Sequence, residues 1–121
     1  MSDRHAFKQL AVQQLPEGGI LVRFTKRRIL SENVIEQIRQ EMQALLAPER
    51  LMLLDMSNVE YLSSAAIGIL INIHRMLHKS TGKLTLCGIP EKIGDLFRIC
   101  KLDRLFEIYP DLESALAARC L

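Results

Sequence analysis

The sequence predicts an α/β fold: a single domain with a mixed, mostly parallel β-sheet, an N-terminal β-hairpin and about four α-helices. Strand-like and helix-like hydrophobic periods alternate along most of the 121 residues. Strands that alternate with helices normally lie side by side in a parallel sheet. The composition, 49% hydrophobic and 25% charged, is that of one compact domain, which we expect to span residues 1–121 with its core at about 7–118.

The first half of the chain predicts the hairpin and one helix. The segments FKQLAVQQL and GILVRFT flank PEGG, whose proline and paired glycines suit a tight reversal. Residues 7–25 are therefore predicted to form a hairpin that extends the sheet at its edge. Ser31 can cap the helix that follows, in which apolar residues recur at steps of three and four until Pro48 closes the segment.

The second half alternates between strands and helices. RLMLLDM is typical of a strand buried on both faces, and the stretch from Ser64 to about Lys79 is long enough for a helix. Gly82 separates that helix from the strand-like KLTLCGI, and a shorter helix is expected from about Glu91 to Cys100. A brief extended LFEIY and a last helix, with Asp111 as its N-cap, complete the chain.

The helix that begins at Ser64 carries apolar residues on more than one face. At about 100° per residue, one side is an apolar stripe that should pack on the sheet: Ala66, Ile69, Leu70, Ile73 and Leu77. The opposite side contains Ser64, Ile67, Ile71, Arg75 and His78. Two interpretations stay open: a neighbouring loop or helix covers the two isoleucines, or they form an exposed surface for a protein partner.

A serine at the start of such a helix could control a partner surface. Phosphorylation adds about −1.5 to −2 charge units, which would oppose binding in the middle of an apolar interface. The backbone amides and the dipole at a helix N-terminus nevertheless favour an anion. Phosphorylation of Ser64 could therefore block association while leaving the fold intact.

Composition and charge argue against several classes of function. The 16 basic and 14 acidic side chains give a net charge of +2, too balanced to attract nucleic acid or anionic lipid. No window approaches the roughly 20 apolar residues of a membrane span, and the N-terminus lacks a signal-peptide stretch, so we expect a cytoplasmic protein. Cys87, Cys100 and Cys120 show no CxxC spacing; we expect two small core fillers and one thiol near the chain end.

The sequence offers no catalytic, metal or cofactor site. A serine nucleophile needs a histidine within about 2.6–3.2 Å, but His74 and His78 follow Ser64 by ten and fourteen residues, roughly 15 and 21 Å along the helix axis. The two histidines have metal-pair spacing, yet Arg75 stands where an HExxH helix carries glutamate, and no third ligand is evident. We interpret them as exposed polar residues. Without a phosphate-binding glycine loop, we expect a non-enzymatic protein with no cofactor.

Two stretches closely resemble the STAS domain of bacterial anti-sigma factor antagonists, over about residues 20–118. They are LMLLDMSNVEYLSSAAIGIL and GKLTLCGIPEKIGDLFRICKLDRLFEIYPDLESAL. The resemblance rests on Asp55 at a strand end, the serine-bearing loop, the GIPE turn and the LDRLFEIY segment. It implies a signalling protein that binds an anti-sigma factor with serine-kinase activity, is phosphorylated by that partner, and is dephosphorylated by a phosphatase.

Carried over by the resemblance, the phosphorylated residue would be Ser64. With Ile67 and Ile71 from the helix face described above, the predicted partner-binding residues are Asp55, Ser57, Ser63, Ser64, Ile67, Gly68 and Ile71. The family usually has Asp-Ser-(Ser/Thr)-Gly at this helix start; here Ser63 replaces the aspartate, and alanines replace the last two residues. Ser63 is thus an alternative phosphorylation site. A third alternative is that neither serine is phosphorylated.

Two other functions and one assembly remain as alternatives. The chain could be a scaffold subunit of a signalling complex without a phosphorylation switch, or a STAS domain that binds a small ligand beside residues 57–64. A homodimer through an exposed sheet edge is a further option.

Overall fold

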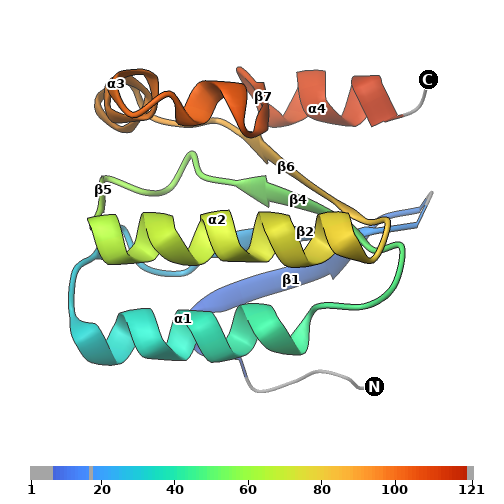
Figure 1. The fold of residues 1–121 in the computed structure, drawn as a ribbon, viewed down its shortest axis with the longest axis horizontal. Coiled ribbons are helices and arrows are strands. Elements are labelled where there is room, and N and C mark those ends of the chain that lie inside the picture. Colours follow the sequence, from blue (N-terminus) through green and yellow to red (C-terminus); the bar gives the residue numbers. More distant parts are fainter. Residues whose placement is uncertain (1–6, 17, 120–121) are drawn as a thin grey trace.

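The computed structural model describes residues 7–16 and 18–119, and its ribbon is shown in Figure 1. The predicted α/β fold is confirmed, with each predicted strand and helix present in the predicted order. The strands are β1 (Leu10–Gln14), β2 (Ile20–Phe24), β3 (Arg28–Ile29), β4 (Leu51–Asp55), β5 (Tyr61–Leu62), β6 (Lys83–Cys87) and β7 (Glu107–Tyr109). The helices are α1 (Glu32–Ala44), α2 (Ser64–Lys79), α3 (Glu91–Ile99), the short 3-10 helix η1 (Leu102–Arg104) and α4 (Leu112–Arg119).

The main sheet has the order β1-β2-β4-β6-β7. Only the β1–β2 pair is antiparallel, and the other pairs are parallel. The hairpin therefore extends a parallel sheet at its edge, as predicted. Gly18 and Gly19 both have positive φ angles in its turn, a backbone conformation that glycine adopts without steric cost.

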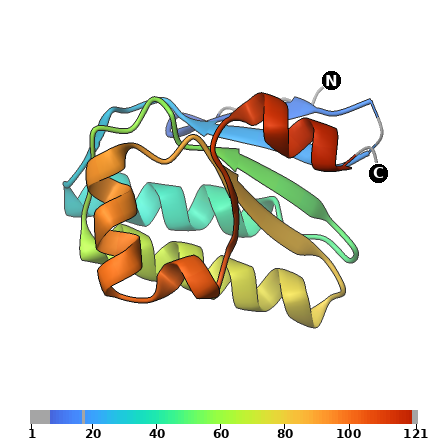
Figure 2. The same cartoon turned by 90° about the horizontal axis from the view of Figure 1, so that it is seen from above.

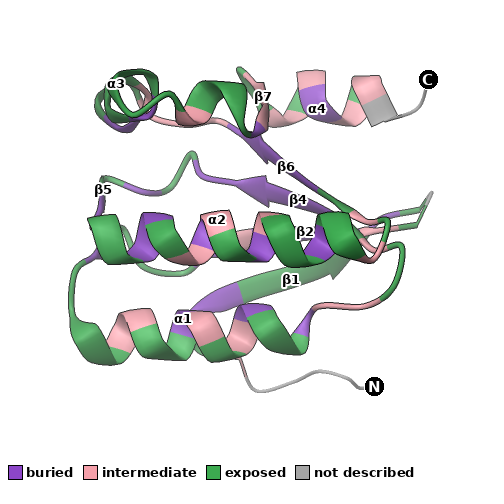
Figure 3. Cartoon of the chain, in the orientation of Figure 1, coloured by how far each residue is buried: buried purple, intermediate pink, exposed green. Residues whose placement is uncertain are grey.

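Helices cover both faces of this sheet, but unequally. Figure 2 shows α1, α2 and α3 on one side of the strands and α4 on the other. The larger core lies under the three helices and includes Met52 and Leu54, whereas the smaller core lies under α4 and includes Leu53. Because successive strand residues point to opposite faces, β4 is buried on both sides, as predicted for RLMLLDM, and Figure 3 shows it buried along most of its length.

A second, two-stranded sheet joins the starts of α1 and α2. β3 pairs with β5 in parallel, with Ile29 opposite Leu62. The N–H of Ser63 donates to the carbonyl of Ile29 at 3.1 Å. This pairing holds the segment before α1 beside the segment before α2. The sequence did not predict these strands, because two residues are too few to show a hydrophobic period.

The free edge of β1 is partly occupied by a side chain of α1. The Glu41 carboxylate accepts backbone N–H groups of Lys8, Gln9 and Leu10 at 3.0–3.2 Å. Of these three residues only Leu10 belongs to β1, so a second sheet that paired with this edge would compete with Glu41 at the first residue of the strand. Covering an edge in this way is a common means of limiting edge-to-edge association.

Two expectations for single side chains are corrected. Cys87 is a buried core residue as expected, and burial raises the pKa of its thiol to about 11. Cys100, also expected in the core, is instead exposed just after α3. Cys120 lies outside the described residues.

The two histidines of α2 differ in exposure. His78 is exposed as predicted, but His74 is half-buried with its ring edge against Phe106, at 5.3 Å between centroids. Burial, followed by the charges of His78 and Arg75, lowers the pKa of His74.

Candidate functional site

The two serines at the start of α2 have different roles. Ser63 is the N-cap, and its hydroxyl oxygen accepts the N–H of Ala66 at 3.3 Å. Ser64 is the first helical residue and is exposed. Within residues 7–16 and 18–119, no hydrogen bond engages the Ser64 hydroxyl. The hydroxyl of Ser64 is therefore accessible, while that of Ser63 stabilises the helix.

The start of α2 is also electrostatically suited to an anion. Its first turn contains no acidic residue, so nothing in that turn neutralises the partial positive charge of the N-terminal amides. A negative charge added at Ser64 would therefore be favourable for the helix.

The predicted exposed face of α2 is only partly exposed. Ile67 is 6% exposed and belongs to the larger core, so the interpretation of Ile67 as an exposed contact is wrong. His74, seven residues later and on the same side of the helix, contacts Phe106. This side of α2 thus faces the segment between η1 and β7, which a single-helix pattern does not reveal. Ile71 is half-buried at the margin of that core.

The rest of the α2 prediction agrees with the structure. Gly68 is exposed, and a Cβ added there would meet no atom within 4 Å. Four residues of the predicted sheet-facing stripe are buried: Ala66, Leu70, Ile73 and Leu77. The fifth, Ile69, is half-buried.

Asp55 organises the loop after β4 from inside. It is 5% exposed; one carboxylate oxygen accepts the N–H of Ser57 at 3.0 Å, and the other accepts Nε–H of Arg23 at 3.0 Å. Strand alternation places Asp55 on the α4 face with Leu53, away from α2. Asp55 therefore shapes the loop that carries the exposed Ser57 and offers little surface of its own.

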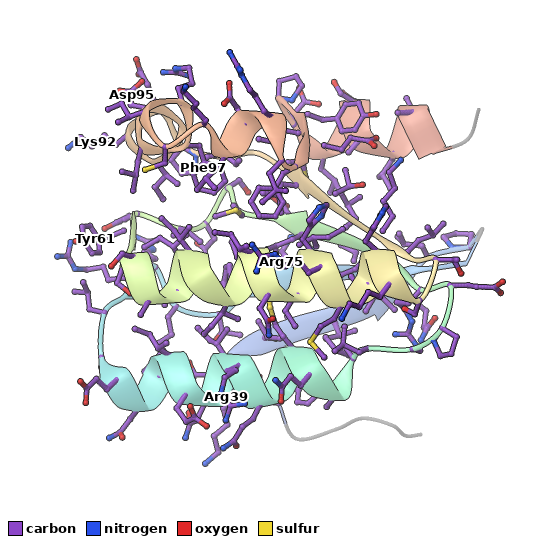
Figure 4. All side chains as sticks on the ribbon, in the orientation of Figure 1. Arg39, Tyr61, Arg75, Lys92, Asp95 and Phe97 are labelled. Atoms are coloured by element: carbon purple, nitrogen blue, oxygen red, sulfur yellow. The ribbon has the colours of Figure 1, made fainter. Side chains whose placement is uncertain are left out.

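Two exposed apolar residues lie beside the start of α2. Leu30 and Tyr61 are each 47% exposed. Leu30 directly follows β3, which pairs with the strand of Tyr61 just before Ser63, and Figure 4 shows Tyr61 at the end of the molecule where α2 begins. The Arg28 guanidinium lies over the Tyr61 ring at 5.9 Å from its centroid.

We define the Ser64 surface by five exposed residues at the start of α2 and in the segments that lead to it: Leu30, Ser57, Tyr61, Ser64 and Gly68. Sequence reasoning identified the two serines and the glycine but missed Leu30 and Tyr61. The β3–β5 pairing that brings them to α2 could not be predicted, because each strand has only two residues.

The different roles of the two serines predict different stabilities. A Ser63→Ala variant should lose about 1 kcal/mol of unfolding free energy, because it leaves an N-terminal amide without its cap. A Ser64→Ala variant should change it by less than about 0.5 kcal/mol. Urea unfolding followed by circular dichroism measures both values. Equal losses in the two variants would contradict the assignment of Ser63 as the cap.

The described residues offer little for other chemistries. Within them, no group of three or more histidine, cysteine, aspartate or glutamate side chains could hold a metal ion. No helix in this described part is long and apolar enough to cross a membrane. Three cavities of the described surface are lined by residues outside the 57–64 loop, the loop suggested as a ligand site.

Comparison with known proteins gives one consistent family. The STAS domain model matches residues 16–115. BtrV of Bordetella bronchiseptica, provisionally named an anti-sigma factor antagonist, is 28% identical over 101 residues, which cover 83% of this chain and 86% of BtrV.

Solved structures show the same fold. An anti-sigma-factor antagonist (STAS) domain protein from Planctomyces limnophilus superposes with a TM-score of 0.79 at 21% identity, covering 93% of this chain and 98% of the other. The anti-sigma factor antagonist SpoIIAA in its unphosphorylated form gives 0.72 at 15% identity, covering 93% and 97%. The phosphorylated form of SpoIIAA, described as a Bacillus cell fate determinant, gives 0.65 at 15% identity, covering 90% and 97%.

Proposed function

The chain belongs to the STAS domain family, and from this premise we propose that it is an anti-sigma factor antagonist whose binding to its partner is switched off by phosphorylation of Ser64. The partner would be an anti-sigma factor with serine-kinase activity, and a phosphatase would reverse the modification. The chain itself would be a non-enzymatic, single-domain protein of the cytoplasm. Its relatives' names support this class of function, since BtrV and SpoIIAA are both named as anti-sigma factor antagonists.

The observation that carries the proposal is the accessible hydroxyl of Ser64. This hydroxyl is exposed at the first residue of α2, whereas the hydroxyl of Ser63 is engaged as the cap. A kinase needs a reachable hydroxyl whose modification does not cost another interaction; Ser64 is exposed, whereas Ser63 is half-buried and its hydroxyl oxygen caps α2. That SpoIIAA has been solved in phosphorylated and unphosphorylated forms supports a switch of this kind on this fold.

The surroundings of Ser64 explain how a phosphate would act. Leu30 and Tyr61 supply the exposed apolar area with which a partner could pack. A phosphate on Ser64 would have to be desolvated if a partner packed on this area, and an uncompensated buried charge is strongly unfavourable. In the free protein the phosphate would remain in water at a helix N-terminus, where its charge is favourable.

The first experiment is intact-mass and phosphopeptide mass spectrometry of the protein isolated from its native cells. We expect one added phosphate, located on Ser64, in part of the population. The co-purified kinase is then titrated against the wild type, Ser64→Asp and Ser64→Ala. Ser64→Asp should bind at least about 10-fold more weakly, equivalent to 1.4 kcal/mol, with an unchanged or slightly higher unfolding temperature.

Two controls separate the alternatives. Ser64→Ala should still bind and should receive no phosphate, while Ser63→Ala should bind and still be phosphorylated. Phosphate on Ser63 alone would move the switch to that residue. A partner that co-purifies with unmodified protein under all growth conditions, and binds Ser64→Asp normally, would overturn the switch and favour the scaffold function.

A further inference from the structure

A cavity lies between α4 and the sheet, on the face opposite α2. Its volume is about 220 Å³, and its lining includes Leu53, Lys83, Thr85, Glu107, Tyr109 and Ala118. Figure 2 shows α4 alone on this side of the sheet. The cavity is therefore separate from the Ser64 surface and takes no part in the proposed binding of the kinase.

The cavity exists because small residues of α4 lie over the sheet. Leu53, Thr85 and Glu107 are direct neighbours on three adjacent strands, so their side chains form one row on the α4 face. Above this row α4 contributes Ala115 and Ala118. Two methyl groups fill little of the space that larger helix residues would occupy.

Thr85 places an unused hydroxyl in this cavity. The residue is 8% exposed in the middle of β6. In the described part of the chain, the Thr85 hydroxyl forms no hydrogen bond. Its oxygen is nevertheless accessible to solvent. It is therefore reached from the cavity that the residue lines. Water in the cavity can reach this oxygen, and a ligand hydroxyl that replaces the water keeps the hydrogen bond while the apolar part of the ligand is buried.

The remaining polar groups form a self-neutralised cluster. Lys83 Nζ lies 2.6 Å from Glu107, and the Tyr109 hydroxyl donates to Glu107 at 2.6 Å. Both interactions lower the pKa of Glu107, so the carboxylate stays ionised beside the ammonium group. With the two charges cancelled, the cavity has no excess charge to attract an ionic ligand. The Tyr109 oxygen retains lone pairs that can accept a hydrogen bond.

We propose that this cavity binds a small uncharged amphipathic molecule: one apolar ring or short branched chain that carries a single hydroxyl group. The apolar part lies against Leu53, Ala115 and Ala118, and the hydroxyl pairs with Thr85. The size agrees, because a cavity of about 150 Å³ accepts benzene, and the volume here is about 220 Å³.

The test uses p-cresol as the probe and toluene as its analogue without a hydroxyl. Each is titrated into the ¹⁵N-labelled full chain and followed by amide chemical shifts. We expect p-cresol to shift saturably the amides of Leu53, Thr85 and Ala118, and to bind more tightly than toluene. Thr85→Val keeps the shape but lacks the hydroxyl, so it should weaken p-cresol binding by about 2- to 10-fold and leave toluene binding unchanged.

Two leucine variants of α4 form a matched pair. Ala118→Leu should fill the cavity and weaken both probes by more than about 10-fold. Ala117→Leu, at an exposed position of the same helix, should leave both affinities unchanged.

Three outcomes would overturn the inference. The first is that neither probe shifts these amides. The second is equal weakening by Ala117→Leu and Ala118→Leu, and the third is binding of toluene as tightly as p-cresol, which would remove the assigned role of Thr85. None of these outcomes bears on the modification of Ser64. The cavity proposal and the phosphorylation switch can therefore be overturned separately.

Discussion

An Ile67→Ala variant is expected to lose about 2–5 kcal/mol of unfolding free energy, the usual cost of removing a large aliphatic side chain from a core. Ile67 is 6% exposed and packs in the core under the three helices. The loss combines the transfer energy of the deleted carbons with the cavity they leave. Urea unfolding of the variant and the wild type measures it.

Ile71→Ala is the control for this prediction. Ile71 lies one turn further along α2 but is only half-buried at the margin of the same core, so its loss should be clearly smaller. If Ile67 were instead a contact for the kinase, its replacement would weaken the complex and leave unfolding unchanged. That result would restore the exposed face and contradict the packing described here.

Gly82→Ala is expected to destabilise the protein by about 1–3 kcal/mol or more, because a Cβ there would overlap neighbouring backbone. The added carbon would lie 3.0 Å from the backbone nitrogen of Arg50 and closer still to its carbonyl oxygen. These atoms belong to the chain entering β4, whose Arg50 carbonyl accepts the N–H of Lys83. The clash therefore falls on the segment that sets the pairing of β4 with β6.

Gly68→Ala is expected to stabilise the protein, although the same substitution at Gly82 destabilises it. Gly68 lies inside α2, exposed, with no atom within 4 Å of an added Cβ. Alanine should raise the unfolding free energy by about 0.5–1 kcal/mol, since glycine is a poor helix former. Thermal unfolding of both variants is the measurement. Similar changes at Gly68 and Gly82 would contradict the close approach of Arg50.

The Gly68 variant also probes the proposed partner surface. If the kinase approaches α2 closely, a methyl group at Gly68 should weaken the complex although it stabilises the free protein. Stability and affinity would then change in opposite directions, which a general loss of structure cannot produce. An unchanged affinity would restrict the contact to the other four residues of the Ser64 surface: Leu30, Ser57, Tyr61 and Ser64.

The protein presents two chemically different regions on opposite faces of one sheet. The Ser64 surface lies at the start of α2, with an accessible hydroxyl and exposed apolar neighbours. The cavity lies under α4, with the buried Thr85 hydroxyl and a neutralised pair of charges. β4 lies between them, since Leu54 faces the larger core and Leu53 faces the smaller one. A ligand in the cavity and a partner at Ser64 could thus occupy the protein together.

The sequence by itself determined the features that depend on neighbouring residues along the chain. Ser31 and Asp111 cap their helices as predicted, accepting the N–H groups of Val34 and Ser114, because a cap involves residues only three positions apart. The order of the main strands and helices also followed from local hydrophobic periods. Ser63 and Ser64 were correctly placed at a helix start for the same reason.

Only the tertiary structure decided which side chains are covered and which remain open. His74, predicted to be exposed, is partly covered because Phe106, more than thirty residues away in the chain, packs against its ring. Ile67, on the same side of α2, is buried in the core that includes Phe106. Leu30 and Tyr61 reach α2 through the pairing of two strands too short to predict. The cavity over Thr85 arises where the alanines of α4 meet three strands. Burial depends on contacts between distant segments. A local hydrophobic pattern can therefore predict which face of a helix packs on the sheet, but not which other residues distant segments will cover.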